Sequence, residues 1–397
     1  MRIRLGEQAV GSLRREEGGR WAFRTLASYR GAVARPVLGQ VFEDDLERVW
    51  RSRNRLPAFF SNLLPEGPLR ELLARELVVS PAKEGSLLLR VGRDLPGAIE
   101  VVPEEEDELP GEDLKLDAPG PSPEAAAGDR ALKFSLAGVQ LKLSVLEGER
   151  GLTVPASGAG GNWIVKLPLD RHPELPAVEL AILLWARQAG FEVPDLRLVR
   201  VEEIGGLPPD WPVREGEALA VRRYDRTEEG SKIHQEDFAQ VLDLYPEKKY
   251  GEASYDTLGR ILLALTGETG LMEFVRRLVF MVLSGNGDAH LKNWSLVYPD
   301  RRTARLSPLY DTVFTRAFIP NDALALSLAG EKQFHRVGPN RFRRFARRVG
   351  ADSERVLDQV HSSSQAIRGA WRSVRADLPL SGRVRELLDA HLGRVRL

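Results

Sequence analysis

The stretch GNGDAHLKNWSLVY, residues 285–298, concentrates polar side chains between two apolar runs and contains Asp288, His290, Lys292 and Asn293. Asp288 and Asn293 stand in the relation D-x₄-N. This is the spacing of the protein-kinase catalytic loop, in which the Asp orients or deprotonates the acceptor hydroxyl and the Asn binds a metal ion. Because such a pair occurs by chance in most chains of this length, the other parts of the site must be found in the right order.

Those other parts follow the order that phosphoryl transfer requires. Asp311, in LSPLYD, comes eighteen residues after Asn293, beyond an apolar strand and a turn, where a second metal-binding carboxylate is expected. Lys166 lies in the apolar strand-like WIVKLP, and Glu179 comes thirteen residues later on a predicted helix, where it can pair with that Lys. Singly, these residues could be a turn carboxylate, an edge-strand charge and a solvated helix residue. In combination they favour a kinase-type site.

The elements that would position this site form four segments. Residues 1–102 mix short strands with a helix from about Leu69 to Val78, and LLLRVGRDLPGAIEVVP is typical of a strand, a Gly turn and a strand. Residues 103–130 are acidic and rich in Pro and Gly, as in a solvated linker. Residues 131–225 contain several predicted strands and one helix ending at Gly190, and residues 226–397 have a helical pattern. This order predicts an α+β, bilobal, protein-kinase-like fold.

Composition limits the function classes. The 397 residues carry 57 basic and 57 acidic side chains, so no global basic excess indicates nucleic-acid or membrane binding. There is no Cys, no signal-type apolar segment at the start and no run of 18 apolar residues, and we therefore expect a cytoplasmic protein. The Arg-rich stretch 341–350 could contact a DNA backbone. Net neutrality favours instead a solvated helix face with Phe342 and Phe345 packed inward.

Lysine is scarce in this chain. Only 10 of the 57 basic residues are Lys, so a retained Lys is a candidate for a position that needs a compact ammonium group. Lys142, Lys166 and Lys292 are three of these ten lysines.

Six ordered segments resemble the HipA family, the bacterial Ser/Thr protein kinases that are the toxins of HipBA-type toxin–antitoxin modules. They are FSLAGVQLKLSV, VKLP, ALAVRRYDR, HQEDFAQVL, GNGDAHLKNWS and LSPLYD. The segments LPAFFSNLLPEGPLRELLARE and GRDLPGAI are similar to the N-terminal part of the family, so the resemblance covers essentially the whole chain.

The resemblance implies roles for individual residues. Asp288 would be the catalytic base, Asn293 and Asp311 the Mg²⁺ ligands, and Ser135 an autophosphorylation site that switches the kinase off. Residues 137–142 would form a loop over the phosphates, and residues 222–224 a hinge beside adenine. The nucleotide-binding residues would be Ala137, Gly138, Val139, Gln140, Leu141, Lys142, Lys166, Arg222, Arg223, Tyr224, His290, Leu291, Lys292, Asn293, Tyr310 and Asp311.

The resemblance also implies ATP and Mg²⁺ as cofactors and several partners. These are an aminoacyl-tRNA synthetase as the protein substrate, a HipB-like helix-turn-helix antitoxin, and operator DNA mainly through that antitoxin. The chain departs from the family at Leu141 and Arg222, where the family often has acidic residues. Two alternatives stay open: a small-molecule kinase of related fold, and a catalytically inactive nucleotide-binding partner of a DNA-binding antitoxin.

Overall fold

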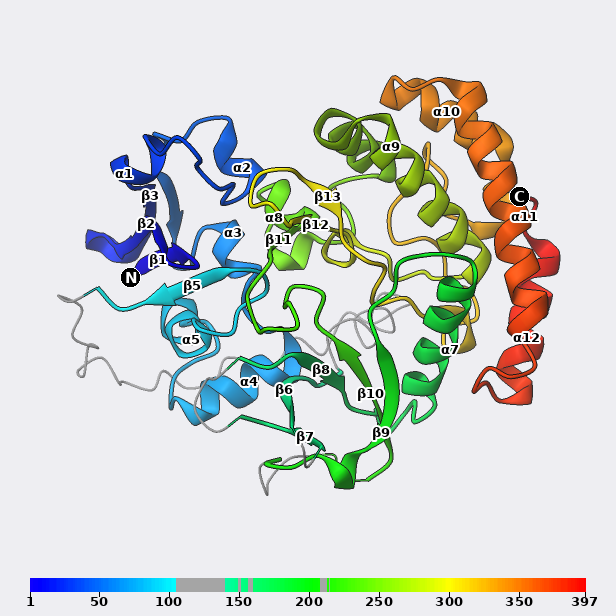
Figure 1. Ribbon diagram of the computed structural model, residues 1–397, viewed down its shortest axis with the longest axis horizontal. Coiled ribbons are helices and arrows are strands. Elements are labelled where there is room, and N and C mark those ends of the chain that lie inside the picture. The colour runs from blue at the N-terminus through cyan, green and yellow to red at the C-terminus, as the bar shows by residue number, and fades with distance from the viewer. Residues whose placement is uncertain (105–139, 149–150, 156–159, 208–212, 214) are drawn as a thin grey trace.

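The computed structural model describes residues 1–104, 140–148, 151–155, 160–207, 213 and 215–397. Three parts are distinguished below: the N-terminal unit (residues 1–104), the central sheet unit (residues 140–225) and the helical unit (residues 226–397). Figure 1 shows the N-terminal unit at one end of the molecule and the C-terminal helices at the other, with the central sheet unit beside both. Most of the predicted linker, residues 103–130, lies outside the described residues.

The N-terminal unit is built on an antiparallel sheet with the strand order β4-β3-β2-β1-β5. Its apolar faces enclose a core rich in aromatic rings, among them Phe23, Phe42, Phe59 and Phe60. The strands are β1 (Arg2–Leu5), β2 (Gln8–Arg15), β3 (Arg20–Thr25), β4 (Trp50–Arg53) and β5 (Ile99–Val102). The helices are α1 (Ala27–Arg30), α2 (Gln40–Glu43), α3 (Ala58–Ser61), α4 (Gly67–Glu76) and α5 (Glu84–Val91).

The predicted helix near residues 69–78 is confirmed as α4, but the predicted strand at Leu87–Val91 is wrong, because these residues form the end of α5. Leu87 and Leu88 of that helix are fully buried. A short apolar run fits a buried strand and a buried helix equally well, so periodicity cannot separate the two. Gly92 ends the helix where a Cβ would meet the Val101 carbonyl oxygen at 2.3 Å, which explains the glycine.

The central sheet unit has the strand order β7-β6-β8-β10-β9. The strands are β6 (Lys142–Gly148), β7 (Gly151–Thr153), β8 (Trp163–Lys166), β9 (Leu196–Arg200) and β10 (Glu217–Arg222). Helix α7 (Leu175–Gln188) lies beside β10 and β9 and buries most of its apolar side chains (Figure 1). The register pairs Lys142 of β6 with Lys166 of β8, which sets two ammonium groups side by side. Like charges in such a pair repel, so this pairing needs a nearby anion.

The helical unit packs its helices around one large apolar core. Its helices are α8 (Phe238–Val241), α9 (Tyr255–Ser284, with a break at Gly267), α10 (Pro339–Val349), α11 (Ser353–Val374) and α12 (Gly382–Arg394). Phe342 and Phe345 of α10 are fully buried, so the prediction that they pack inward is confirmed. None of the described helices is long and apolar enough to cross a membrane.

The apolar strand predicted between Asn293 and Asp311 is confirmed, but the helical pattern predicted after Arg226 missed the strand that pairs with it. Strands β11 (His234–Asp237), β12 (Ser295–Tyr298) and β13 (Arg305–Leu306) form a small sheet in the order β11-β12-β13. Strand β11 is four residues long and polar in sequence, so it has no alternation that could be recognised. Its partner β12 follows almost sixty residues later and directly continues the catalytic-loop segment.

Candidate active site

A cleft of about 640 Å³ lies where the three units meet. Its size is that of a site for a small molecule or cofactor. The predicted residues that line it are Gln140, Lys142, Lys166, Glu179, Arg222, Arg223, Tyr224, Asp288, His290, Lys292, Asn293, Tyr310 and Asp311. Leu141 and Leu291 are buried in apolar cores and do not line it. Ser135, Ala137, Gly138 and Val139 lie outside the described residues.

The turn that carries Asp288 begins where helix α9 ends. Gly285 caps the helix in the left-handed conformation, with φ +63°. At Gly287, a Cβ would lie 1.8 Å from Oδ2 of Asp322, so no side chain fits there. These two glycines explain the broken sequence GNGD: the chain must reverse sharply out of a buried helix and bring Asp288 to the cleft.

Asp288 is held through both its side chain and its main chain. Its Oδ1 atom accepts a 2.6 Å hydrogen bond from the hydroxyl of Tyr250. Its main-chain N–H donates to Oδ1 of Asn286, and its main-chain carbonyl accepts a 2.8 Å bond from Nδ2 of Asn293. Burial raises the pKa of Asp288 to about 7, although the Tyr250 hydrogen bond acts in the opposite direction. The two ends of the D-x₄-N pair are therefore in direct contact through the backbone.

Asp311 provides the negative charge that compensates the two lysines on the sheet. It lies after the β12–β13 hairpin with φ +53°, an unusual conformation for a residue other than glycine. Its carboxylate is 2.8 Å from Nζ of Lys142 and also pairs with Lys166, which in turn pairs with Glu179 of α7. Burial alone would raise the pKa of Asp311, but the two ammonium groups outweigh burial and hold it well below its usual range. Lys166 is therefore a buried cation and Asp311 an anion.

His290 has an unsatisfied ring nitrogen at the cleft. Its Nδ1 atom is buried without a hydrogen-bond partner among the described residues. Burial and the charge of Lys249 lower the pKa of the ring, so the imidazole is neutral. A buried polar atom without a partner costs free energy, and a ligand in the cleft can satisfy it.

Lys292 lies in the predicted segment, but its ammonium group contacts protein. It donates to the main-chain carbonyl and Oδ1 of Asn62 at 2.8 and 3.0 Å, and it lies 3.1 Å from Asp237 and 3.6 Å from Glu66. The hydroxyl of Tyr310 bonds to the hydroxyl of Ser295 and donates to the main-chain carbonyl of Lys292. Tyr310 thus also supports the loop that carries Lys292.

Sequence reasoning missed several residues that hold this site. Tyr250 and Asn286 fix Asp288, and Lys249 is buried against Glu66 at 2.7 Å. The scarcity of Lys applied equally to Lys249 and could have indicated it. No comparable signal marks Asn286 or Glu66, because their partners are distant in sequence or are main-chain atoms.

The residues present fit a hard cation bound together with phosphates. Among the described residues there is no group of three or more His, Cys, Asp or Glu side chains that could hold a metal ion. Mg²⁺ is commonly held by one or two protein ligands plus substrate phosphates, so it does not need such a cage. Asp311 supplies a carboxylate, and the amide of Asn293 uses its nitrogen for Asp288 and keeps its oxygen for another partner.

Family models match both halves of the chain. The model described as the HipA N-terminal domain matches residues 1–102, and the HipA-like C-terminal domain matches residues 134–371. The chain belongs to the HipA family. The predicted membership is thus confirmed over most of the sequence.

Individual HipA relatives agree with this assignment. A protein of Sinorhizobium fredii named "Putative kinase Y4dM" is 40% identical over 403 residues, which cover 100% of this chain and 97% of that protein. The serine/threonine-protein kinase toxin HipA of Shewanella oneidensis is 25% identical over 66% of this chain and 63% of its own length.

A solved HipA structure has the same fold. It comes from a complex of Shewanella oneidensis HipA, HipB and operator DNA, and it matches 99% of this chain and 96% of its own with a TM-score of 0.76 at 22% identity. The predicted α+β, bilobal, HipA-like fold is confirmed by this match.

Proposed function

We propose that this HipA-family protein is a serine/threonine protein kinase that uses ATP and Mg²⁺. The observation that carries the proposal is the meeting of Asp288, Asn293, Asp311 and Lys166 in one cleft, although they come from three separate segments. The buried Nδ1 of His290 without a partner supports a polar ligand in the same cleft. Names of relatives that describe kinases support the same reaction class.

In this proposal Asp288 accepts the proton of the acceptor hydroxyl. Tyr250 occupies its Oδ1 atom, so the other carboxylate oxygen is left to accept the hydroxyl proton. The acceptor oxygen then forms a bond to the γ-phosphorus of ATP as the bond between that phosphorus and the bridging oxygen of ADP breaks. Because Tyr250 fixes the carboxylate and Asn286 fixes the main chain of Asp288 beforehand, little reorganisation is needed at the moment of transfer.

Lys142 and Lys166 would bind the phosphates directly, and Asp311 and Asn293 would act through Mg²⁺. Lys166 is held in place by Glu179, so its ammonium group is fixed on the sheet when phosphate oxygens approach. Asp311 and Asn293 would hold Mg²⁺, which when bound neutralises charge on the phosphate oxygens. Lys142 is the more exposed of the two lysines and can turn from Asp311 to a phosphate.

We further propose that the kinase acts as the toxin of a toxin–antitoxin module. The substrate would be a translation component, in particular an aminoacyl-tRNA synthetase, and its phosphorylation would arrest growth. A HipB-like helix-turn-helix protein would be the antitoxin and would carry the complex to operator DNA. Support comes from the family and from the Shewanella oneidensis structure, whose title describes a complex with HipB and operator DNA. Autophosphorylation of Ser135 would switch the enzyme off.

The test is transfer of labelled phosphate from ATP to protein. The purified chain is incubated with γ-labelled ATP and Mg²⁺, with a bacterial lysate depleted of nucleotides as the acceptor mixture. Labelled protein bands that require Asp288 support the proposal. Labelled small molecules with no labelled protein would indicate a small-molecule kinase, and ATP binding without any transfer would indicate an inactive nucleotide-binding protein.

A further inference from the structure

The N-terminal unit supplies one wall of the cleft. Two of its loops, residues 62–66 and 93–96, line the cleft together with residues from both other units. The lining residues outside the N-terminal unit belong to the central sheet unit and the helical unit. Here a third part of the chain reaches the site at two places, and each place is marked by buried charges.

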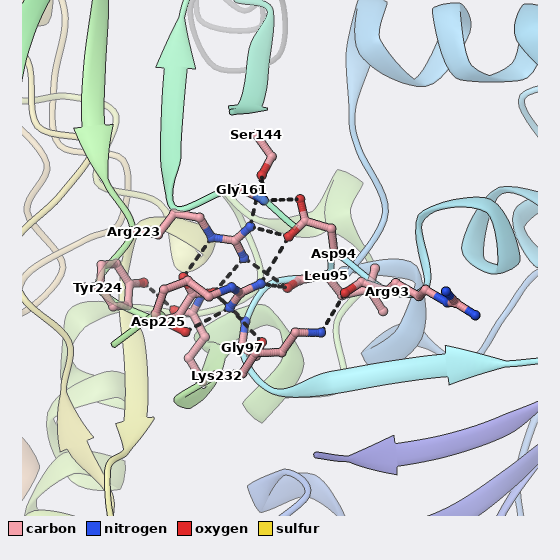
Figure 2. Close-up of polar contacts among 12 residues, drawn as sticks. Arg93, Asp94, Leu95, Gly97, Ser144, Gly161, Arg223, Tyr224, Asp225 and Lys232 are labelled. Carbon is pink, nitrogen blue, oxygen red and sulfur yellow. Dashed lines mark hydrogen bonds and ion pairs between the residues drawn. The ribbon is translucent and has the colours of Figure 1, made fainter. Parts of the chain in front are cut away.

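The first place is the hinge, where Asp94 joins a buried network (Figure 2). Its Oδ1 atom lies 2.6 Å from Nη1 of Arg223 and 3.2 Å from Nη2 of Arg226. Its Oδ2 atom accepts a 3.3 Å bond from the N–H of Gly161, in the turn before β8. Asp225 pairs with both arginines at 2.8 and 3.0 Å. One carboxylate of the N-terminal unit thus ties the hinge to the turn that leads into the strand of Lys166.

Charges in this network balance. Two guanidinium groups face two carboxylates, and all four side chains are at most 15% exposed. Burial alone would raise the pKa of Asp94, but Arg223, the Ser144 hydroxyl, Arg226 and the N–H of Gly161 together outweigh burial and hold the pKa below its usual range. Removal of the Asp94 charge would leave a buried guanidinium without its counter-charge, and this is strongly unfavourable. Residues 223–226 would then have to move to reach water or another anion.

The second place is the catalytic loop, where Glu66 meets two lysines. Its Oε2 atom lies 2.7 Å from Nζ of Lys249, and its Oε1 atom lies 3.6 Å from Nζ of Lys292. Lys249 is 5% exposed, and among the described residues its ion-pair partner is Glu66. Lys292 has further partners in Asn62 and Asp237.

Lys249 connects this contact to the proposed base. Its main-chain carbonyl accepts a bond of 3.2 Å from the N–H of Leu291, inside the catalytic loop. The next residue, Tyr250, donates its hydroxyl to Asp288. A displacement of Lys249 would therefore reach the catalytic loop through its backbone and through Tyr250.

We infer that the N-terminal unit completes the active site through two positioning residues: Asp94, which fixes the hinge, and Glu66, which fixes the catalytic loop. This rests on the proposed kinase function. The two contacts lie at different parts of the cleft, so their effects separate. Loss of Asp94 should lower the affinity for nucleotide, and loss of Glu66 should slow phosphoryl transfer.

The test compares Asp94→Asn and Glu66→Gln, which keep the size of each side chain and remove its charge. Affinity is measured with fluorescent mant-ATP, and the rate constant for transfer to casein is measured at saturating ATP. We expect Asp94→Asn to weaken mant-ATP binding about tenfold, as for a buried charge that has lost its partner, with little change in the transfer rate. We expect Glu66→Gln to slow transfer about 10- to 100-fold, as for a misplaced catalytic group, with little change in affinity.

Glu100→Gln is the matched control. Glu100 also belongs to the N-terminal unit and pairs with Lys232 of the helical unit at 2.7 Å, but neither residue lines the cleft. This variant should leave both readouts unchanged. Equal losses of affinity and rate in Asp94→Asn and Glu66→Gln, or losses no larger than in Glu100→Gln, would overturn the inference. If Asp94→Asn does not fold, Asp94→Glu keeps the charge, misplaces the contacts and should weaken mant-ATP binding in the same direction.

Hydrogen exchange without nucleotide separates this inference from the proposed function. Glu66→Gln should speed amide exchange in residues 288–293 and not in residues 223–226, and Asp94→Asn should do the reverse. If the wild-type protein transfers no phosphate, the kinase proposal fails, and hydrogen exchange still decides the positioning roles. Unchanged exchange in both variants would overturn them even in an active kinase.

Discussion

The hydroxyl of Tyr250 donates a 2.6 Å hydrogen bond to Oδ1 of Asp288, and this contact fixes the carboxylate at the end of a buried turn. Only one carboxylate oxygen is then left for an acceptor. Burial raises the pKa of Asp288 to about 7, so the group is far easier to protonate than an exposed Asp. A carboxyl group with such a pKa in a cleft is typical of a functional site.

We expect Asp288→Asn to abolish phosphoryl transfer while folding and mant-ATP affinity stay close to those of the wild type. The substitution removes the acceptor of the hydroxyl proton and leaves Lys142, Lys166 and Asp311 in place. General-base contributions are roughly 10²- to 10⁴-fold, so transfer of labelled phosphate should fall at least a hundredfold. Retention of more than about a tenth of the wild-type rate would exclude Asp288 as the base.

A matched control for this variant is Asp300→Asn. Asp300 is an exposed Asp in the turn after β12, where its carboxylate bonds to Thr303 and to the N–H of Arg302. It lies outside the cleft, so its loss should leave transfer unchanged. A comparable loss of transfer in both variants would indicate a general effect on the protein.

Asp311→Ala should separate Mg²⁺-dependent from metal-free nucleotide binding. Asp311 compensates two ammonium groups, and its removal leaves Lys142 without a carboxylate partner and Lys166 with Glu179 alone, so both can still attract phosphates. Metal-free binding should therefore persist, while the added affinity from Mg²⁺ should disappear because a carboxylate ligand of a hard cation is lost. Calorimetry with ATP, in the presence of Mg²⁺ or of a chelator, measures both.

The contrary outcome for Asp311 is an equal loss of affinity with and without Mg²⁺. That result would mean that Asp311 serves only to keep the two lysines in place. Thermal unfolding of the same variant provides the check, because Lys142 would lose its carboxylate partner and Lys166 would keep only Glu179, which should also lower stability.

The core of the site could be predicted because its chemistry is local in sequence. Asp288 and Asn293 lie on one short loop, and Lys166 and Glu179 lie on a strand and the helix after it, so spacing alone brings them close. Asp311 follows at the end of a hairpin, which is also a short-range feature. The long helices α7 and α9 could also be predicted, because their sequences are strongly apolar over many residues.

What could not be predicted depends on contacts between distant segments. Glu66 meets Lys249 and Lys292 across more than 180 residues, and Asp94 meets Arg223 across 129 residues. No pattern in a single sequence links such positions. Strand β11 could not be predicted for a related reason, since it is a strand only because β12 provides its hydrogen-bond partners. Helix α5 was missed because its apolar run is too short to show a period.

The buried carboxyl group of Glu236 should make the stability of the folded protein depend on pH. It is buried between the N-terminal and helical units, where it accepts bonds from the N–H of Gln40 and the hydroxyl of Tyr298 and forms no ion pair with the described residues. Burial raises its pKa to about 8, from an ordinary value of 4.5. The folded state therefore holds this proton more tightly than the unfolded state, and its contribution to stability is lost as the pH rises from about 4.5 to about 8.

Comparison of the wild type with Glu236→Gln isolates this effect. The glutamine keeps the size of the side chain and stays neutral, so the free energy of unfolding should fall less steeply with pH in the variant than in the wild type. Nearby His234 has its pKa lowered by burial to about 4 and contributes equally to both proteins. Urea unfolding at pH 5, 6.5 and 8 gives the slopes, and parallel curves would contradict the prediction.

Ser135 should become phosphorylated when the active protein is incubated with ATP and Mg²⁺, and this should reduce its activity. Ser135 lies outside the described residues, and the prediction rests on its place in the sequence, seven residues before Lys142 at the start of β6. Lys142 pairs with Asp311, so the segment after Ser135 leads directly to the predicted phosphate site. A phosphate adds about −1.5 to −2 units of charge, which would compete with Asp311 and with ATP for the two lysines.

Intact mass followed by peptide mapping tests this, with Ser135→Ala and Asp288→Asn as the matched pair. Ser135→Ala should stay active and gain no phosphate in that peptide, and its activity should not decline during incubation as that of the wild type does. Asp288→Asn should gain phosphate only when mixed with active protein, because its own base is lost while its Ser135 remains an acceptor. A wild-type enzyme that transfers phosphate to other proteins and never carries it on Ser135 would exclude this off switch, because the modification could then not be the cause of any loss of activity.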